Sequence, residues 1–101
     1  MDIGQVEGYK INYMKGGVYI LICKNNRYYI GSTNNIIRRL FEHKNGLVSA
    51  TKYLLPVRLV FFQKIEDISL ARKIEYKLKK MKSKNIIEKI IKDGYIKLAG
   101  L

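Results

Sequence analysis

The chain has few of the residues that build disulfides and zinc sites. Its 101 residues include one cysteine, Cys23, and one histidine, His43. A single cysteine excludes an intrachain disulfide, and one cysteine with one histidine cannot complete a Cys/His zinc site within one chain. Cys23 ends an apolar run over residues 18–23, where a free thiol usually packs as a small hydrophobe. We therefore expect neither a structural zinc ion nor a redox role.

Long apolar runs are also missing. The longest, such as residues 18–23, fall far short of the roughly 20 residues that a membrane-spanning helix needs. Residues 1–15 alternate polar and apolar side chains and lack the hydrophobic core of a signal peptide. We therefore expect a cytoplasmic protein without a membrane partner.

Acidic residues are scarce. Eight Asp and Glu stand against 20 Lys and Arg, which gives a formal net charge of +12 at pH 7. An excess of this size indicates a polyanionic partner, and nucleic acid is the usual one. A ribosome or an anionic membrane surface would suit the same sign, so charge alone names a class of partner and no reaction.

The chain is long enough for one folded domain, with a hydrophobic share of 48%. The pattern predicts a mobile N-terminal arm at residues 1–15, an α+β domain at residues 16–94 with the element order ββαβαα, and a C-terminal tail at residues 95–101. Since Met14 precedes the first apolar run closely, we also expect residues 1–13 to be dispensable for folding.

The first half of this domain reads as a hairpin followed by a helix. Residues 16–31 hold two β-branched and aromatic runs separated by Asn25-Asn26, which suits a tight turn. Residues 32–35 then offer successive N-caps, and Gly46 marks the end of the helix. The apolar stripe of this helix is Ile36, Ile37, Leu40 and Phe41.

The second half contains one more strand and two helices. In chain order we expect a loop at residues 47–56, a strand at residues 57–64, a helix from Asp67 or Ser69 to about Met81, and a helix capped by Ser83 and ended by Gly94. The last helix is expected to face inward through Ile86, Ile87, Ile90 and Ile91.

Polar side chains of the hairpin and the first helix form a candidate site. A tight hairpin brings Tyr19 and Tyr29 together, and the next helix carries Arg39 and His43 four residues apart on one face. That face differs from the apolar stripe, so neither side chain needs to be buried in the core, and both can point toward the end of the hairpin. A guanidinium matches phosphate oxygens. The alternative is that Arg38, Arg39 and His43 form an ordinary solvated basic face.

Glu75 is a lone carboxylate within a basic stretch of the second predicted helix. It can pair with Lys79 at the favourable i,i+4 spacing. It can also bind a hard divalent cation, which prefers carboxylate oxygen and takes further ligands from water and a substrate phosphate. Two phenols, a guanidinium, an imidazole and a carboxylate in a basic protein suit the metal-assisted cleavage of a phosphodiester.

These residues carry a family resemblance. Gly17-Val18-Tyr19 followed by Tyr29-Ile30-Gly31 resembles the two-part signature of the GIY-YIG endonuclease family, with Val in place of Ile. The resemblance continues through Arg39, His43 and Glu75 and covers residue 16 to about residue 91. Three stretches are similar to its small stand-alone UPF0213 or YhbQ-like group: residues 29–33, 38–43 and 57–60. The family fold is a three-stranded antiparallel sheet flanked by helices.

The resemblance implies a role for each site residue. Glu75 binds one Mg²⁺ or Mn²⁺, which contacts the scissile phosphate and stabilises the departing oxygen. Tyr19 orients or deprotonates the attacking water, and Tyr29 holds that water or a phosphate oxygen. Arg39 neutralises the charge that develops on the phosphate, and His43 assists proton transfer or positions Tyr19. No small-molecule cofactor is implied.

One position departs from the family pattern. Many members place Lys directly after the second glycine of the signature, where this chain has Ser32. A free phenol has a pKa near 10, so forming its phenolate at neutral pH costs roughly 4 kcal/mol. In this chain His43, Arg39 or the metal must lower this barrier, or else the enzyme is slow and its activity in isolation is weak.

The resemblance implies an endonuclease that cleaves DNA, with structure selectivity in repair or processing. Since no separate DNA-binding module fits into 101 residues, nucleic acid must be held by the domain's own basic surface, with DNA favoured over RNA. Two alternatives stay open: a non-catalytic nucleic-acid-binding domain and a ribosome-associated RNA-binding protein. The candidate nucleic-acid contacts are Arg38, Arg72, Lys73, Lys79 and Lys80.

Overall fold

The structure is a computed structural model, and it describes residues 5–6, 9–10 and 14–98. Within the expected N-terminal arm, two short strands, β1 (Gln5–Val6) and β2 (Tyr9–Lys10), pair in antiparallel fashion. Met14, which also belongs to the expected arm, is buried against the main domain. Residues 1–4, 7–8 and 11–13 of the arm and residues 99–101 of the expected tail lie outside the described residues.

The centre of the domain is a three-stranded antiparallel sheet, as the resemblance implied. Its strands are β3 (Gly17–Ile22), β4 (Tyr28–Thr33) and β5 (Arg58–Lys64), in the order β4-β3-β5. The predicted hairpin is confirmed. Its turn places Asn25 and Asn26 at φ values of 64° and 59°, a left-handed region that Asn tolerates better than most residues.

Three helices follow the predicted order, and each begins at a side-chain cap. Asn35 accepts a hydrogen bond from the Arg38 amide at the start of α1 (Ile36–Lys44). Asp67, rather than the alternative Ser69, caps α2 (Ile68–Met81). Ser83 caps α3 (Lys84–Asp93), which ends at Gly94 as expected. Local capping chemistry therefore sets these helix boundaries.

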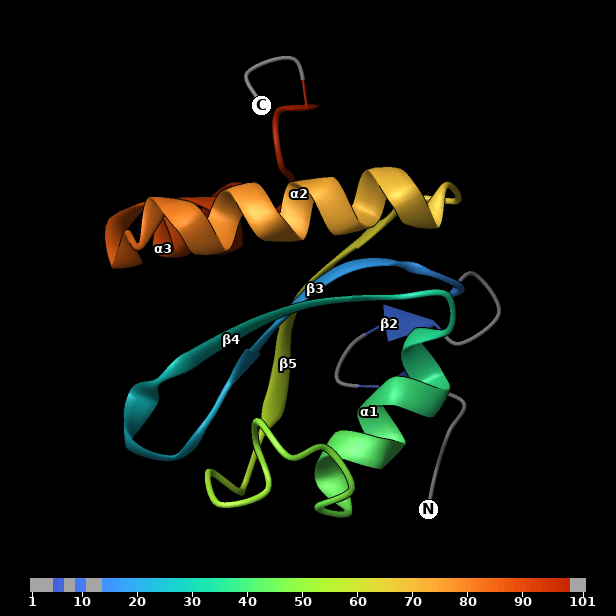
Figure 1. The fold of residues 1–101 in the computed structure, drawn as a ribbon, viewed down its shortest axis with the longest axis vertical. Coiled ribbons are helices and arrows are strands. Elements are labelled where there is room, and N and C mark those ends of the chain that lie inside the picture. Colours follow the sequence, from blue (N-terminus) through green and yellow to red (C-terminus); the bar gives the residue numbers. More distant parts are fainter. Residues whose placement is uncertain (1–4, 7–8, 11–13, 99–101) are drawn as a thin grey trace.

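The sheet separates two apolar clusters. Alternate residues of β3 face opposite sides: Val18 and Ile20 pack toward α2 and α3, whereas Tyr19 and Leu21 pack toward α1. Figure 1 shows α2 and α3 lying together on one side of the sheet and α1 on the other. Because β3 is the central strand, both of its faces are buried.

The last helix differs from the prediction at one position. Ile87 and Ile90 are buried, but Ile86 is 39% exposed because its place on the helix turns it away from the sheet. After α3 the chain packs back onto the domain: Ile96 is buried, and its amide donates a hydrogen bond to Gln63 Oε1 at 2.6 Å. Among the described helices, none has the length and apolarity to cross a membrane.

Candidate active site

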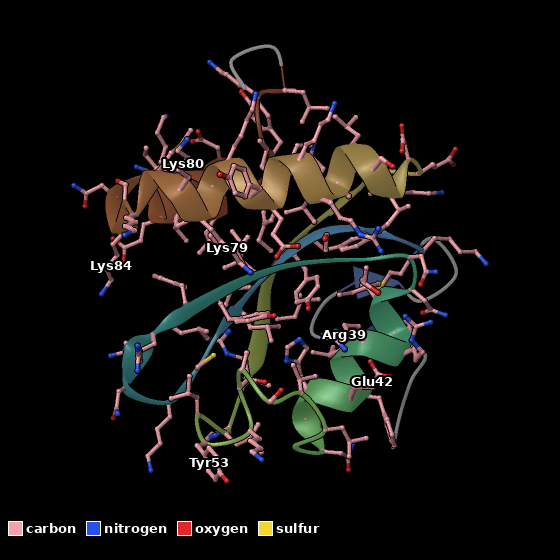
Figure 2. All side chains as sticks on the ribbon, viewed as in Figure 1. Arg39, Glu42, Tyr53, Lys79, Lys80 and Lys84 are labelled. Carbon is pink, nitrogen blue, oxygen red and sulfur yellow. The ribbon has the colours of Figure 1, made fainter. Side chains whose placement is uncertain are left out.

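Four of the five predicted catalytic residues line one hollow of about 480 Å³, which we call the central hollow. Tyr19 comes from β3, Tyr29 from β4, Arg39 from α1 and Glu75 from α2. The hollow lies at the β4 edge of the sheet, and in Figure 2 Arg39 and Lys79 lie on opposite sides of β4. Its remaining lining residues are Gly31, Ser32, Arg72, Tyr76 and Lys79. Residues far apart in the chain therefore meet at one place.

The glycines of the two-part motif permit close approach. Gly31 lies opposite Tyr19 in the β3–β4 ladder, and a Cβ on Gly31 would fall less than 3.0 Å from the Tyr19 ring and hydroxyl. A Cβ on Gly17 would collide with the backbone carbonyl of Gln63 in the neighbouring strand. The motif thus lets the Tyr19 ring cross β4 and reach the hollow.

Behind the hollow, three polar side chains form a buried chain of hydrogen bonds. The Tyr19 hydroxyl lies 2.7 Å from His43 Nε2, and His43 Nδ1 lies 2.8 Å from Thr51 Oγ1. All three side chains are at most 1% exposed. His43 points toward Tyr19 of the hairpin, and it is fully buried because the loop after α1 brings Thr51 against its ring. Arg39, one turn earlier, is half-buried as expected for a residue at the hollow.

Burial controls the charge of this chain. It raises the pKa of Tyr19 well above the ordinary phenol value, although the nearby Arg39 guanidinium opposes this. Burial, together with Arg39, lowers the pKa of His43 to about 4. Both groups are therefore neutral at pH 7. A neutral imidazole has one donor and one acceptor nitrogen, so when Tyr19 donates to Nε2, Nδ1–H donates to Thr51.

Glu75 both pairs with Lys79, as its i,i+4 spacing predicted, and lines the central hollow. Its Oε2 accepts a hydrogen bond from Lys79 Nζ at 2.6 Å, so the i,i+4 pair is present, and its Oε1 accepts one from the Ser32 hydroxyl. The carboxylate is also part of the hollow's lining, beside the two tyrosines. Lys79 Nζ lies 5.2 Å from the centre of the Tyr29 ring, so α2 brings an ammonium group to the hollow.

The hollow suits a metal bound by one carboxylate. Among the described residues, no group of three or more Asp, Glu, His and Cys lies close enough to hold an ion. The described residues therefore do not form a site in which protein side chains alone coordinate a metal ion. A Mg²⁺ or Mn²⁺ ion that keeps most of its waters needs only one carboxylate and a substrate phosphate. Glu75 fits that requirement, and the ion would compete with Lys79 for its oxygen.

The five candidate nucleic-acid contacts do not gather at one place. Arg72 and Lys79 line the central hollow, but Lys73 lies against Leu70 and Leu98 in a separate small hollow. Lys80 projects from the side of α2 away from the sheet (Figure 2), with its Nζ 5.9 Å from the Tyr76 ring centre.

Arg38, the fifth candidate, is held near its own helix start. It donates to Asn34 Oδ1 at 3.0 Å and lies 3.9 Å from a Glu42 oxygen. Glu42 also pairs with Arg39 at 3.1 Å and thereby holds the guanidinium in place. Sequence reasoning missed the parts played by Glu42, Thr51 and Tyr76. The i,i+3 spacing of Arg39 and Glu42 is a signal that could have revealed one of them.

Comparison with known proteins identifies the family of the chain. The model of the GIY-YIG catalytic domain family matches residues 15–89. A UPF0213 protein of Listeria monocytogenes serotype 4b (strain F2365) is 40% identical over 79 residues, which cover 77% of this chain and 82% of the relative. A UPF0213 protein of Syntrophus aciditrophicus (strain SB) is 42% identical over 69 residues, covering 66% and 79%. No solved structure matches the chain. The chain belongs to the GIY-YIG family.

Proposed function

We propose that this protein is a metal-dependent endonuclease that hydrolyses phosphodiester bonds in DNA. Membership of the family supports a nuclease-type reaction on nucleic acid. The observation that carries the proposal is the meeting of Tyr19, Tyr29, Arg39 and Glu75 around one hollow. Three cations line the hollow, Arg39, Arg72 and Lys79, and they suit a substrate with a concentrated negative charge.

In this proposal the scissile phosphate lies in the central hollow. Arg39, held by Glu42, donates to its oxygens as negative charge builds up during attack. Tyr29 contacts the attacking water or a phosphate oxygen. Glu75 would hold Mg²⁺ or Mn²⁺, which when bound stabilises the departing oxygen. Many family members place a Lys directly after the motif glycine, where this chain has Ser32. In this chain Lys79 brings a cation close to Tyr29 instead.

The buried chain of Tyr19, His43 and Thr51 provides a path for the water's proton. A standing phenolate is disfavoured because burial raises the pKa of Tyr19. Instead, as water attacks phosphorus, its proton moves to the Tyr19 oxygen while the Tyr19 proton moves to His43 Nε2, 2.7 Å away. The neutral imidazole can accept this proton, but its lowered pKa makes it a weak base, so the imidazolium that forms is only transient. In the tautomer with a proton on Nδ1, that nitrogen donates to Thr51 Oγ1 and Nε2 is free to accept.

Cleavage assays with three site variants test the proposal. Labelled DNA is incubated with the protein and Mg²⁺ or Mn²⁺, alongside Glu75→Gln, Arg39→Ala and Tyr19→Phe. We expect each variant to lose about 10²-fold or more in rate, whereas Arg58→Ala on the opposite edge of the sheet keeps the wild-type rate. Cleavage that persists undiminished in Glu75→Gln would contradict the mechanism. Cleavage rates on DNA and on RNA then test the proposed DNA preference. Rates on linear, branched and damaged DNA test the proposed role in repair or processing.

A non-catalytic nucleic-acid-binding domain is the second candidate. It is favoured by the state of Glu75, whose two oxygens are already held by Ser32 and Lys79, and by the burial of Tyr19. This candidate predicts nucleic-acid binding without cleavage for every metal and substrate. Its ribosome-associated form further predicts preference for RNA and co-sedimentation with ribosomes.

A further inference from the structure

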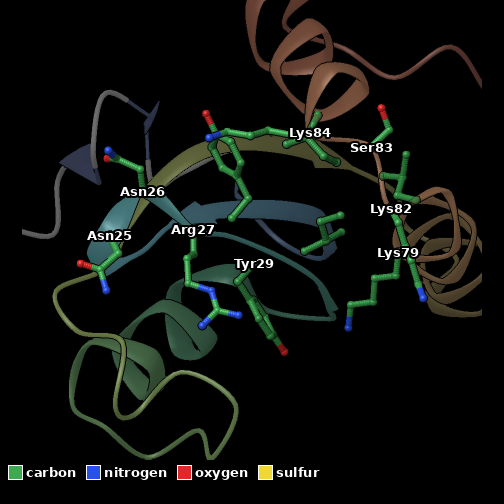
Figure 3. Close-up of a pocket in the computed structure, with 12 residues that line it drawn as sticks. Asn25, Asn26, Arg27, Tyr29, Lys79, Lys82, Ser83 and Lys84 are labelled. Atoms are coloured by element: carbon green, nitrogen blue, oxygen red, sulfur yellow. The ribbon is translucent and has the colours of Figure 1, made fainter.

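A second hollow of about 500 Å³ adjoins the central hollow, and we call it the basic groove. It lies between the β3–β4 turn and the junction of α2 with α3. Tyr29 and Lys79 line both hollows, so the basic groove continues from the central hollow around the open edge of β4. Figure 3 shows Arg27 on the strand side and Lys82 and Lys84 on the helix side.

The charged residues that line the basic groove are all basic. Arg27, Lys79, Lys82 and Lys84 line it, and no Asp or Glu is among its described lining residues. Lys79 pairs with Glu75, but Arg27, Lys82 and Lys84 form no ion pair with any carboxylate in the part of the chain that the structure describes. Glu88 stands near the rim, 3.3 Å from the Tyr28 hydroxyl. Three uncompensated cations along a groove indicate an extended anionic ligand.

The groove also presents two aromatic rings. Tyr28 and Tyr29 are both half-buried, so each is anchored in the domain and partly open to the groove. Lys84 Nζ lies 5.9 Å from the centre of the Tyr28 ring. Cations that follow a backbone, together with aromatic rings that accept unpaired bases, are the combination that single-stranded nucleic acid requires. A duplex keeps its bases stacked on one another and would leave the Tyr28 ring without a base to stack on.

We infer that the basic groove binds the unpaired nucleic-acid strand that flanks the scissile phosphate. Arg27, Lys82 and Lys84 hold its phosphates, and a base stacks on the exposed part of Tyr28. This inference rests on the proposed function, because the position of the scissile phosphate in the central hollow sets where the strand enters. It makes the substrate class a nucleic acid with an unpaired tract next to the cleavage point.

Binding measured without cleavage tests the inference. The protein carries Glu75→Gln, divalent metal is chelated, and fluorescence anisotropy reports the binding of a labelled 12-nucleotide single strand. The groove pair Arg27→Ala and Lys84→Ala is compared with the control pair Arg58→Ala and Lys64→Ala on β5. Both pairs remove one Arg and one Lys from exposed positions, so their net charge is the same.

We expect the groove pair to lower affinity about tenfold or more at low salt, and the control pair to lower it less than twofold. Each phosphate contact contributes about 0.7 to the slope of log affinity against log salt for single strands, so the groove pair should reduce that slope by about 1.4. Equal losses in both pairs would overturn the inference, because they would reflect net charge alone.

The stacking step has a test of its own. Tyr28→Leu keeps apolar volume against the core but removes the ring, and we expect about fivefold weaker binding of the normal strand and no change for one with abasic residues. Equal affinity of wild type for a duplex of the same length, or for poly-glutamate, would overturn the preference for an unpaired strand. These assays involve neither metal nor cleavage. A wild-type protein that bound the strand but cleaved no nucleic acid would therefore refute the proposed function and leave the inference about the groove intact.

Discussion

Replacing Thr51 by Val probes the buried hydrogen-bond chain with little change of shape. Valine matches threonine in volume but removes the hydroxyl that lies 2.8 Å from His43 Nδ1. The ring nitrogen then has no partner at a site where the side chains are fully buried. An unsatisfied buried polar group costs roughly 1–3 kcal/mol, so we expect the free energy of unfolding in urea to fall by that amount.

The same change alters the tautomer of His43. Without Thr51, an Nδ1–H has no acceptor, and the imidazole gains by placing its proton on Nε2, where it donates to the Tyr19 oxygen. Nε2 can then no longer accept the Tyr19 proton, so the cleavage rate should fall about 10-fold to 100-fold at unchanged substrate affinity. Nitrogen NMR shifts of the ring report the tautomer directly. Thr51→Ser restores the hydroxyl and should recover both tautomer and rate. Full activity with an Nδ1–H tautomer in Thr51→Val would refute the reasoning.

Three further results are expected. Gly31→Ala places a Cβ against the Tyr19 ring. We expect this variant to lose about 1–3 kcal/mol of unfolding free energy and most of the cleavage activity. Wild-type stability and cleavage rate would contradict the proposed packing. The pKa of His43 in the folded protein is about 4, below its ordinary value of 6.5, so the unfolded chain binds more protons between these values. Stability measured by urea unfolding should therefore fall as pH drops from 6.5 to 4, by about 3 kcal/mol in total, and a pH dependence unchanged in His43→Gln would contradict this. Lys79→Met frees a Glu75 oxygen, so titration of bound Mn²⁺ should show tighter binding than in wild type; equal or weaker binding would show that Lys79 and the metal do not compete.

Local signals were sufficient for most of the fold. Asn25-Asn26, Asp67 and Ser83 each act within a few residues, by tolerating a left-handed backbone or by accepting an amide hydrogen bond, and the structure confirms their turn and caps. The sheet extends further than predicted, to Thr33, because β4 pairs with β3 beyond the motif glycine. Such pairing depends on the partner strand, so the sequence of residues 32–33 alone does not predict it.

The site could be predicted only in part from the sequence, because some of its contacts join segments that no local pattern connects. The motif residues could be placed because a hairpin and a helix face determine which side chains meet. The burial of His43 depends on Thr51, which lies in a loop without periodicity, so helix-face reasoning alone could not predict it. The basic groove joins Arg27 to Lys84 across the fold, and no local pattern connects them.

The most direct measurement is a crystal structure with Mn²⁺ and a single-stranded oligonucleotide whose phosphodiesters resist cleavage, read by anomalous scattering. The account predicts one Mn²⁺ peak at coordination distance from a Glu75 oxygen, bridging to a phosphate that Arg39 contacts. A peak elsewhere, or a phosphate outside the hollow that Tyr19 and Tyr29 line, would contradict it.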